Sequence, residues 1–92
     1  MDLTDLIQSA VREGRFAVSH HAHRRLRERR IELWQVKVGM DEAVVVEERP
    51  QDQPNPSIVT QQALADGTTV VVIWAWSVEE NQALLVTVFF PD

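Results

Sequence analysis

Apolar residues recur at helical spacing along the first dozen positions of the chain. They lie three or four positions apart, which places them on one face of a helix: Leu3, Leu6, Ile7, Ala10 and Val11. Thr4 is the side chain that we expect to cap the N-terminus of this helix, and Gly14 suits its C-terminal end. The pattern therefore predicts a first helix that ends before Gly14.

A second helical stretch begins after a short bridge, Phe16 to Val18. Ser19 stands where an N-cap belongs, and the residues that follow are rich in Arg, Leu and Ala, which favour helix. Apolar residues continue from Ile31 to Glu42, so either this helix kinks near Arg30 or a third short helix follows. In both cases we expect helices over about residues 3–42.

From Ala43 onward the pattern changes from helical to extended. Short β-rich runs are separated by a Pro-rich loop over 50–56, an Asp66-Gly67 turn and a polar loop over 78–81. The runs predict four strands at about 43–49, 57–64, 68–77 and 82–90. We expect residues 1–92 to form one α+β domain, with N-terminal helices packed on a four-stranded antiparallel β-meander over about 43–90.

The run 68–77 is apolar on both of its faces. One face suits contact with the helices, and the other needs a cover, which a second copy of the chain could provide as a homodimer. Packing within the chain is the alternative explanation. A third hypothesis is an assembly subunit that binds a partner through Trp74 and Trp76.

Composition bears on the setting of the protein. The chain has no Cys, its N-terminus lacks a basic start with a long apolar stretch, and no apolar run approaches the length of a membrane span. We therefore expect a cytoplasmic protein with no membrane contact. The net charge of -5 argues against nucleic acid, but eight of the nine basic residues lie between positions 12 and 37.

The arginine-rich helix divides into three arcs on a helical wheel. Ala22 and Leu26 mark the buried stripe, and one row of side chains lies at its border: His21, Arg25 and Arg29. The solvated arc carries the others, with Glu28 one turn from Arg24: His20, His23, Arg24 and Arg27. A side chain at the border could contact a ligand that lies over the sheet.

A histidine beside arginines suits RNA cleavage without a metal. A neutral imidazole at His21 could take the proton of a 2′-hydroxyl, while Arg25 and Arg29 neutralise charge on the phosphorane. There are noncatalytic explanations for both residue types. His21 could be a solvated or capping histidine. The aliphatic stems of the arginines could cover apolar surface, with Arg27 and Arg30 paired with glutamates at the sheet edge. His20 and His23 lie one turn apart, but no third metal ligand follows at a defined spacing, so we expect no metal or other cofactor.

The segment Ser19-His20-His21-Ala22-His23-Arg24-Arg25-Leu26-Arg27-Glu28-Arg29-Arg30-Ile31 resembles an uncharacterised bacterial family whose helix reads Ser-x-His-Ala-x-x-Arg-Leu-x-x-Arg-x-Ile. The C-terminal run Leu85 to Asp92 is similar to the last strand of that family, in which Thr-Val-aromatic precedes a proline. The family is grouped with RelE/ParE-like toxins and with the barnase, EndoU, colicin and RelE fold, whose members are mainly metal-independent ribonucleases. The resemblance implies His21 as base, Arg25 and Arg29 as phosphate-contacting groups, and Thr87 as a polar site residue.

Together these observations predict a RelE-like toxin that cleaves RNA as an endoribonuclease and is held in check by an antitoxin protein. Arg24, Arg27 and Arg30 would add RNA-binding charge outside the catalytic row. The alternative is a noncatalytic RNA- or protein-binding member of the same fold, since the predicted sheet has no Lys or Tyr and Arg49 is its one basic residue. For Thr87, the alternative is a strand former whose methyl packs in the core.

Overall fold

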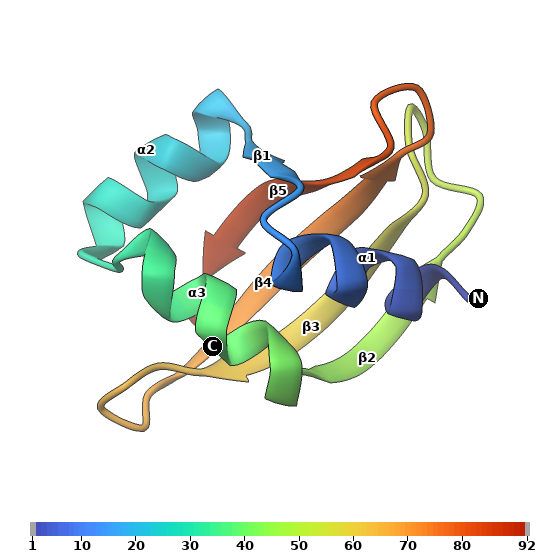
Figure 1. Ribbon diagram of the computed structural model, residues 1–92. Coiled ribbons are helices and arrows are strands. Elements are labelled where there is room, and N and C mark those ends of the chain that lie inside the picture. The colour runs from blue at the N-terminus through green and yellow to red at the C-terminus, as the bar shows by residue number, and fades with distance from the viewer. Residues whose placement is uncertain (1, 92) are drawn as a thin grey trace.

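Residues 2–91 are described by the structure, a computed structural model in which helices lie against one face of a five-stranded sheet (Figure 1). The helices are α1 (Leu3–Arg12), α2 (His20–Arg29), α3 (Leu33–Gly39) and the short 3-10 helix η1 (Met40–Glu42). The strands are β1 (Phe16–Val18), β2 (Val44–Arg49), β3 (Ser57–Ala63), β4 (Thr69–Ser77) and β5 (Gln82–Phe89). The α+β class is therefore confirmed.

The helix α1 forms where the apolar spacing predicted it, but its cap is a different residue. Asp2 has an extended backbone and its side chain accepts a hydrogen bond of 2.8 Å from the N–H of Asp5. Thr4 lies inside the helix, and its hydroxyl donates to Glu48 at 3.0 Å. The prediction of Thr4 as the cap is wrong, because Asp2 already satisfies the free N–H groups of the first turn.

Two separate helices follow β1, so the choice between a kinked helix and a third helix is settled. Arg30 adopts a left-handed backbone, with φ of 56°, directly after α2. The N–H of Ile31 then donates to the carbonyl of Leu26 at 2.9 Å, which closes the end of α2. Glu32 is extended, and α3 begins at Leu33.

The sheet has the order β1-β5-β4-β3-β2 and is mixed rather than fully antiparallel. The four predicted strands form the antiparallel part, from β2 to β5. The expectation of four strands missed β1, which pairs with β5 in parallel, with Phe16 opposite Ala83 and Val18 opposite Leu85. Three residues are too few to show an alternating pattern, so the sequence alone indicates no more than a bridge there.

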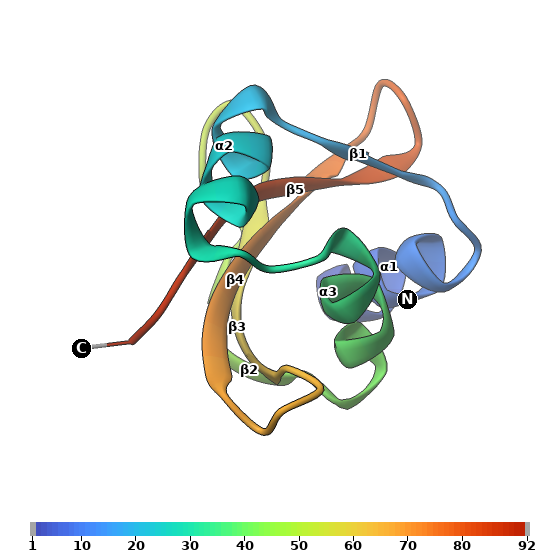
Figure 2. The same cartoon turned by 90° about the vertical axis from the view of Figure 1, so that its left-hand side faces the viewer.

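The core lies between the sheet and the helices α1 and α3 (Figure 2), and the buried residues of α2 join it at the edge of the sheet. Trp74 is fully buried and Trp76 is 7% exposed, and the ring of Phe16 meets Trp74 edge-on at 6.1 Å. The indole N–H of Trp74 donates to the buried side chain of Gln62 at 3.1 Å. The hypothesis of a partner-binding surface at Trp74 and Trp76 is therefore wrong, because both side chains fill the core.

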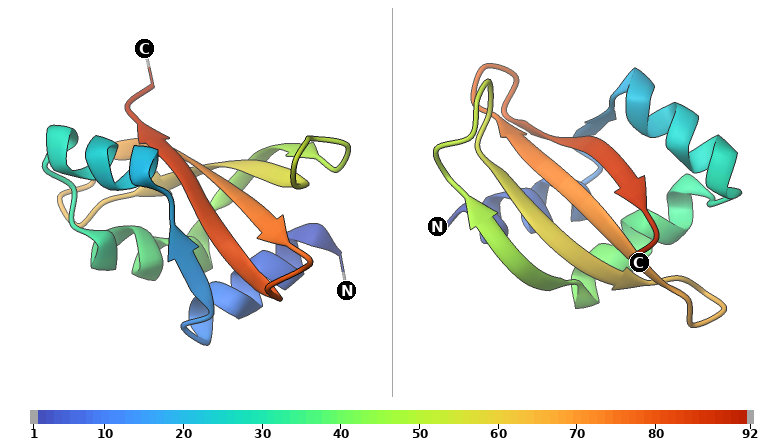
Figure 3. Two further views of the ribbon diagram at one scale, coloured as in Figure 1. Left: turned by 90° about the horizontal axis from the view of Figure 1, so that it is seen from above. Right: turned by 180° about the vertical axis from the view of Figure 1, so that it is seen from behind.

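Within residues 2–91, no helix covers the opposite face of the sheet, which is visible from behind in Figure 3 (right). On this face the β4 residues Val71 and Ala75 are nevertheless 8% and 4% exposed, and Ile73 is half-buried. The loop over 50–56 reaches this face, since Pro54 and Asn55 line a hollow together with Ile73 and Ala75. The chain itself thus supplies part of the cover that a second copy could have provided. Among the described helices, none is long and apolar enough to cross a membrane.

Candidate functional site

Ser19 places the arginine-rich helix α2 at the edge of the sheet. β1 covers the first half of β5, and the N–H of Ser19 continues this pairing by donating to the carbonyl of Leu85 at 3.0 Å. The Ser19 hydroxyl accepts from the N–H of Ala22 at 3.0 Å, which confirms it as the cap of α2. The same hydroxyl donates to the carbonyl of Val86 at 3.0 Å, so α2 starts in contact with β5.

A bulge in β5 lies directly beside this cap. Ile73 of β4 is opposite Thr87 and Trp74 is opposite Leu85, which leaves Val86 as an extra residue in the strand. The alternative for Thr87, a methyl packed in the core, requires Thr87 to share a face with Ala83 and Leu85, and the extra residue breaks that alternation. Ala83 and Leu85 are fully buried in the core, whereas Thr87 is half-buried at the strand edge.

His21 and Thr87 are brought together by the cap and the bulge. Nε2 of His21 lies 2.9 Å from Oγ1 of Thr87, a hydrogen-bond distance between α2 and β5. His21 is exposed, although its place at the border of the buried stripe predicted a side chain beside a ligand lying over the sheet. The difference arises because α2 lies beside the edge of β5 rather than over the sheet (Figure 2), so solvent reaches its border row.

The rest of the predicted border row follows β5 toward its end. Ala22 is fully buried and Leu26 is 5% exposed, which confirms the buried stripe of α2. At the far end of the helix, the guanidinium carbon of Arg29 lies 5.8 Å from the centre of the Phe90 ring, within cation–π range. His21 therefore contacts β5, and Arg29, about two helical turns further along α2, contacts Phe90 just after the end of that strand.

Arg25, between them, is held by an acid of its own helix. Its Nη1 lies 2.7 Å from Oε2 of Glu28, and Oε1 of the same carboxylate lies 3.9 Å from Nε of Arg24. The predicted Arg24 pair is thus present, but Arg25 makes the shorter contact, which the wheel did not reveal. Any phosphate that binds Arg25 has to compete with Glu28.

The remaining arginines, Arg27 within α2 and Arg30 at its end, are exposed. Among the described residues, the ion pairs of α2 go to Glu28 and not to the glutamates of the sheet. Glu47 instead binds Arg49 at 2.7 Å, and this hydrogen bond holds the pKa of Glu47 below its ordinary value. The charge of Arg27 and Arg30 therefore faces solvent.

The histidines of α2 also lie on an exposed surface. His20 and His23 are exposed, like His21. Within residues 2–91, no group of three His, Asp or Glu side chains comes close enough together to hold a metal ion. The chemistry that this surface offers is that of one oriented imidazole beside several guanidinium groups.

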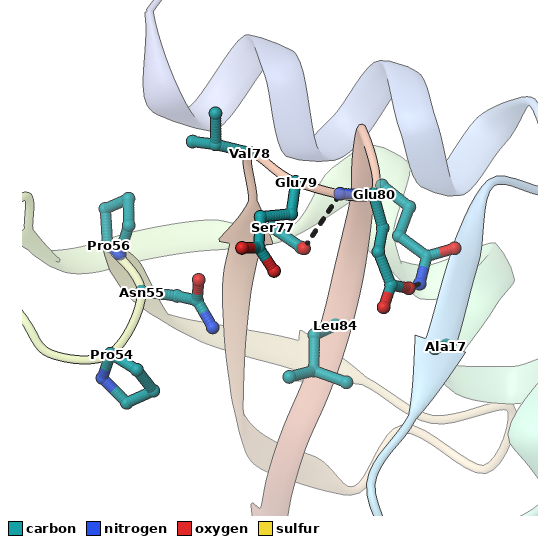
Figure 4. Close-up of a pocket in the computed structure, with 10 residues that line it drawn as sticks. Ala17, Pro54, Asn55, Pro56, Ser77, Val78, Glu79, Glu80 and Leu84 are labelled. Carbon is teal, nitrogen blue, oxygen red and sulfur yellow. Dashed lines mark hydrogen bonds between the residues drawn. The ribbon is translucent and has the colours of Figure 1, made fainter.

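A further hollow, which the sequence did not predict, lies away from α2. It has a volume of about 610 Å³ on the helix-free face, between the Pro-rich loop and the turn after β4 (Figure 4). Leu84 of β5 and Ala17 of β1 contribute to its floor, and Glu79 and Glu80 to its rim. Only the folding of 54–56 against this face creates it, so the pattern of the separate strands gave no indication of it.

The fold and the site define a class of protein: a small α+β domain with an arginine-rich helix beside a bulged strand of a mixed sheet. The family model of a domain of unknown function (DUF4258) matches residues 18–90, and the chain belongs to this family. The match includes Ser19, His21 and Thr87, and α1 lies outside it. Comparisons with curated proteins and with solved structures found no match.

Proposed function

We propose that this protein is a RelE-like bacterial toxin with metal-independent ribonuclease activity, in which α2 binds RNA. The observation that carries the proposal is the contact of His21 Nε2 with Thr87 Oγ1 at 2.9 Å, beside a helix that carries four arginines and ends at a fifth. This contact joins residues 66 positions apart in the sequence and fixes the orientation of the imidazole on β5. The resemblance of the α2 motif to the RelE/ParE-like group supports the same assignment.

The hydrogen bond to Thr87 orients the imidazole of His21. In the proposed state Nε2–H donates to the Thr87 hydroxyl, and the free lone pair of Nδ1 faces solvent as the base. Nδ1 takes the proton of a 2′-hydroxyl, and the 2′-oxygen forms a bond to phosphorus. The bond from phosphorus to the 5′-oxygen breaks, and water gives that oxygen a proton. The imidazolium of His21 returns its proton to the hydroxide so formed, and the products are a 2′,3′-cyclic phosphate and a 5′-hydroxyl.

Arg25 and Arg29 act on the charge of the reacting phosphate. They lie one and two turns along α2 from His21, so a backbone that passes His21 can follow the same row. The guanidinium groups neutralise charge that builds on the non-bridging oxygens. Arg24, Arg27 and Arg30 contribute sequence-independent attraction to neighbouring phosphates, because the described ion pairs leave Arg27 and Arg30 facing solvent.

A second candidate is a noncatalytic member of the same fold that binds RNA or a protein through α2. Two observations favour it. The strands carry a single basic residue, Arg49, and that residue is paired with Glu47. His21 is also exposed, whereas a general base is often partly desolvated. In this second candidate the contact between Thr87 and His21 only fixes the position of α2, and the protein binds RNA or a protein partner without cleaving RNA.

The proposed toxin acts in the cytoplasm, where a small antitoxin protein inhibits it. An inhibitor of this kind has to cover α2 or compete with RNA for the arginines. A homodimer is a further partner proposal, although the low exposure of Val71 and Ala75 leaves little of the β4 face for it.

The test is RNA cleavage by the purified chain in the presence of EDTA, with the product ends identified by mass spectrometry. His21→Gln should lower the cleavage rate by about 10²- to 10⁴-fold, the usual contribution of a general base. His23→Gln is the matched control, since His23 is an exposed histidine of the same helix. Equal losses in the two variants would sink the assignment of His21.

The hydroxyl of Thr87 has its own test. Thr87→Val keeps the shape of the side chain but removes the contact with His21, so cleavage should fall, and Thr87→Ser should restore it. RNA affinity should remain near that of the wild type in all of these variants. Binding without cleavage by the wild type would establish the noncatalytic alternative.

Expression in a bacterial host tests the toxin assignment itself. We expect the wild type to arrest growth and His21→Gln to abolish the arrest, with the far-UV circular dichroism spectrum unchanged. Growth arrest that persists in His21→Gln would contradict the proposal, as would the absence of arrest in the wild type.

A further inference from the structure

The helix-free face carries a second feature that the ribonuclease proposal does not use. The hollow of about 610 Å³ and a neighbouring one of about 260 Å³ share Pro54, Asn55 and Leu84. We call the two together the back groove. Its floor is formed by short or aliphatic side chains of three neighbouring strands: Ala17 of β1, Leu84 and Val86 of β5, and Ile73 and Ala75 of β4.

One rim of the back groove is acidic and structurally fixed. The N–H of Glu80 donates to the Ser77 hydroxyl at 3.2 Å, and its carboxylate accepts from Gln82 Nε2 at 2.6 Å (Figure 4). Arg15 donates to the carbonyl of Asn81 at 2.6 Å and so holds the same turn. Glu79 is exposed beside them. The turn therefore holds the carboxylate of Glu80 in place, and Glu79 adds a second carboxylate to the rim.

Nearby basic side chains do not neutralise most of this acidic charge. The charge of Arg15 is shared with Glu13 at 2.9 Å, and Arg49, the basic residue lining the smaller hollow, pairs with Glu47 at 2.7 Å. Outside positions 12–37 the chain carries eleven acidic residues against Arg49 alone. The back groove is thus an apolar floor with an acidic rim, on the sheet face opposite α1 and α3.

We propose that the back groove binds an extended segment of a partner protein in which aliphatic and basic side chains alternate. In an extended chain, successive side chains point to opposite sides. Aliphatic side chains can therefore pack on Leu84 and Ile73, while Lys or Arg side chains reach the carboxylates of Glu79 and Glu80. The acidic rim repels nucleic acid, so this site is separate from the proposed RNA surface.

The acidic rim also favours this occupant over a second copy of the chain. A two-fold dimer through this face uses the same patch on both subunits, so it brings both acidic rims into one interface. Like charges in an interface are unfavourable, whereas basic side chains of a partner neutralise them. The inference holds whether or not the protein cleaves RNA.

The probe is a fluorescein-labelled peptide, Val-Lys-Val-Lys-Val-Lys, titrated with the full chain and followed by fluorescence anisotropy. The wild type should bind it, and the Glu79→Lys/Glu80→Lys variant should bind about tenfold more weakly or less. The matched control is Glu32→Lys/Glu42→Lys, which makes the same change in net charge at exposed positions outside the groove. This control should keep most of the wild-type affinity.

Several results would overturn the inference. They are absence of binding by the wild type, equal weakening in the groove and control variants, and equal binding of the acidic peptide Val-Glu-Val-Glu-Val-Glu. Amide resonances locate the peptide independently: those of Ala17, Ser77 and Leu84 should shift on binding. Shifts confined to the open edge strand β2 would contradict the proposal, as would a dimer by light scattering that Glu79→Lys/Glu80→Lys disrupts.

Discussion

The imidazole of His21 on α2 lies 2.9 Å from the hydroxyl of Thr87 on β5, across 66 positions of the sequence. A regular helix and a regular strand would not by themselves bring these two side chains together. Ser19 fixes the start of α2 on β5, and the extra residue Val86 moves Thr87 out of the strand alternation. The geometry of the candidate site therefore depends on a helix cap and a bulge.

Removal of the Ser19 hydroxyl should destabilise the fold at this junction. Ser19→Ala loses the hydrogen bond to the N–H of Ala22 and the one to the carbonyl of Val86. We expect the free energy of unfolding to fall by about 1–2 kcal/mol, measured by urea denaturation. Ser19→Thr, which keeps a capping hydroxyl, should lose much less. Equal losses in Ser19→Ala and Ser19→Thr would show that the hydroxyl is not what stabilises the junction.

The sequence predicted the elements whose patterns are long and regular. α1, α2 and the strands β2 to β5 lie within a few residues of their expected bounds. α1 and the strands have apolar or β-rich runs bounded by turn residues, and α2 has a clear N-cap followed by residues that favour helix. β1 was missed because its three residues form a strand only through pairing with β5, about 67 positions away. The cap of α1 was misplaced because Asp2 and Thr4 are both good capping residues.

The candidate site was predictable in part, and for two different reasons. The wheel placed Ala22 and Leu26 inside and the row of His21, Arg25 and Arg29 at the border of α2. The pattern of β5 alone favoured a core position for Thr87, and only the resemblance to a known family named it as a polar site residue. The bulge at Val86 explains the failure, since one inserted residue reverses the faces of a strand and leaves no mark in composition.

The stability of the β3–β4 hairpin should depend on pH through Asp66. The carboxylate of Asp66 accepts a hydrogen bond of 2.9 Å from the N–H of Thr68, and backbone hydrogen bonding holds its pKa below the ordinary value of 3.8. A lowered folded-state pKa stabilises the fold above the unfolded pKa, and this stabilisation is lost as the pH falls through the folded pKa.

The comparison that measures this effect is the melting temperature of the wild type and of Asp66→Ala across the acid range. The wild type should be more stable by a constant margin above about pH 5, and the margin should shrink below about pH 4. Asp66→Asn retains an acceptor oxygen without a charge, so its margin over Asp66→Ala should stay constant. A wild-type margin that is the same at pH 2 and pH 7 would rule out the carboxylate as its source.

Arg30→Gly should raise stability while it lowers RNA affinity. The left-handed backbone of Arg30, with φ of 56°, is a conformation that glycine adopts without steric cost. We expect an increase in the free energy of unfolding of about 0.5–1 kcal/mol, measured by thermal denaturation. Asn81→Gly, at φ of 52°, should be stabilised less because Asn tolerates this conformation.

The RNA half of this prediction follows from the charge of Arg30. Loss of one phosphate contact should reduce the slope of log K against log salt by about 0.7 for single-stranded RNA. Asn81→Gly should leave the slope unchanged, since it removes no charge. An unchanged slope in Arg30→Gly would remove Arg30 from the RNA surface and leave its backbone role intact.

Glu28 should act as an internal competitor of RNA on α2. Its carboxylate lies 2.7 Å from Arg25 and 3.9 Å from Arg24, so a phosphate that approaches either group must displace it or meet its repulsion. Glu28→Gln removes the negative charge and keeps a polar side chain of the same shape. RNA affinity should therefore rise by about three- to tenfold at low salt, with a salt slope steeper by about 0.7 for each additional phosphate that the arginines bind.

Glu32→Gln provides the comparison for this variant, because Glu32 is exposed and makes no side-chain hydrogen bond at the start of α3. It changes the net charge equally, so any rise in affinity that both variants share measures only long-range attraction. The excess in Glu28→Gln then measures the release of Arg25 and Arg24. If the two variants bind RNA equally well, Arg25 and Arg24 do not contact the phosphates, and the RNA surface must lie on Arg27, Arg29 and Arg30.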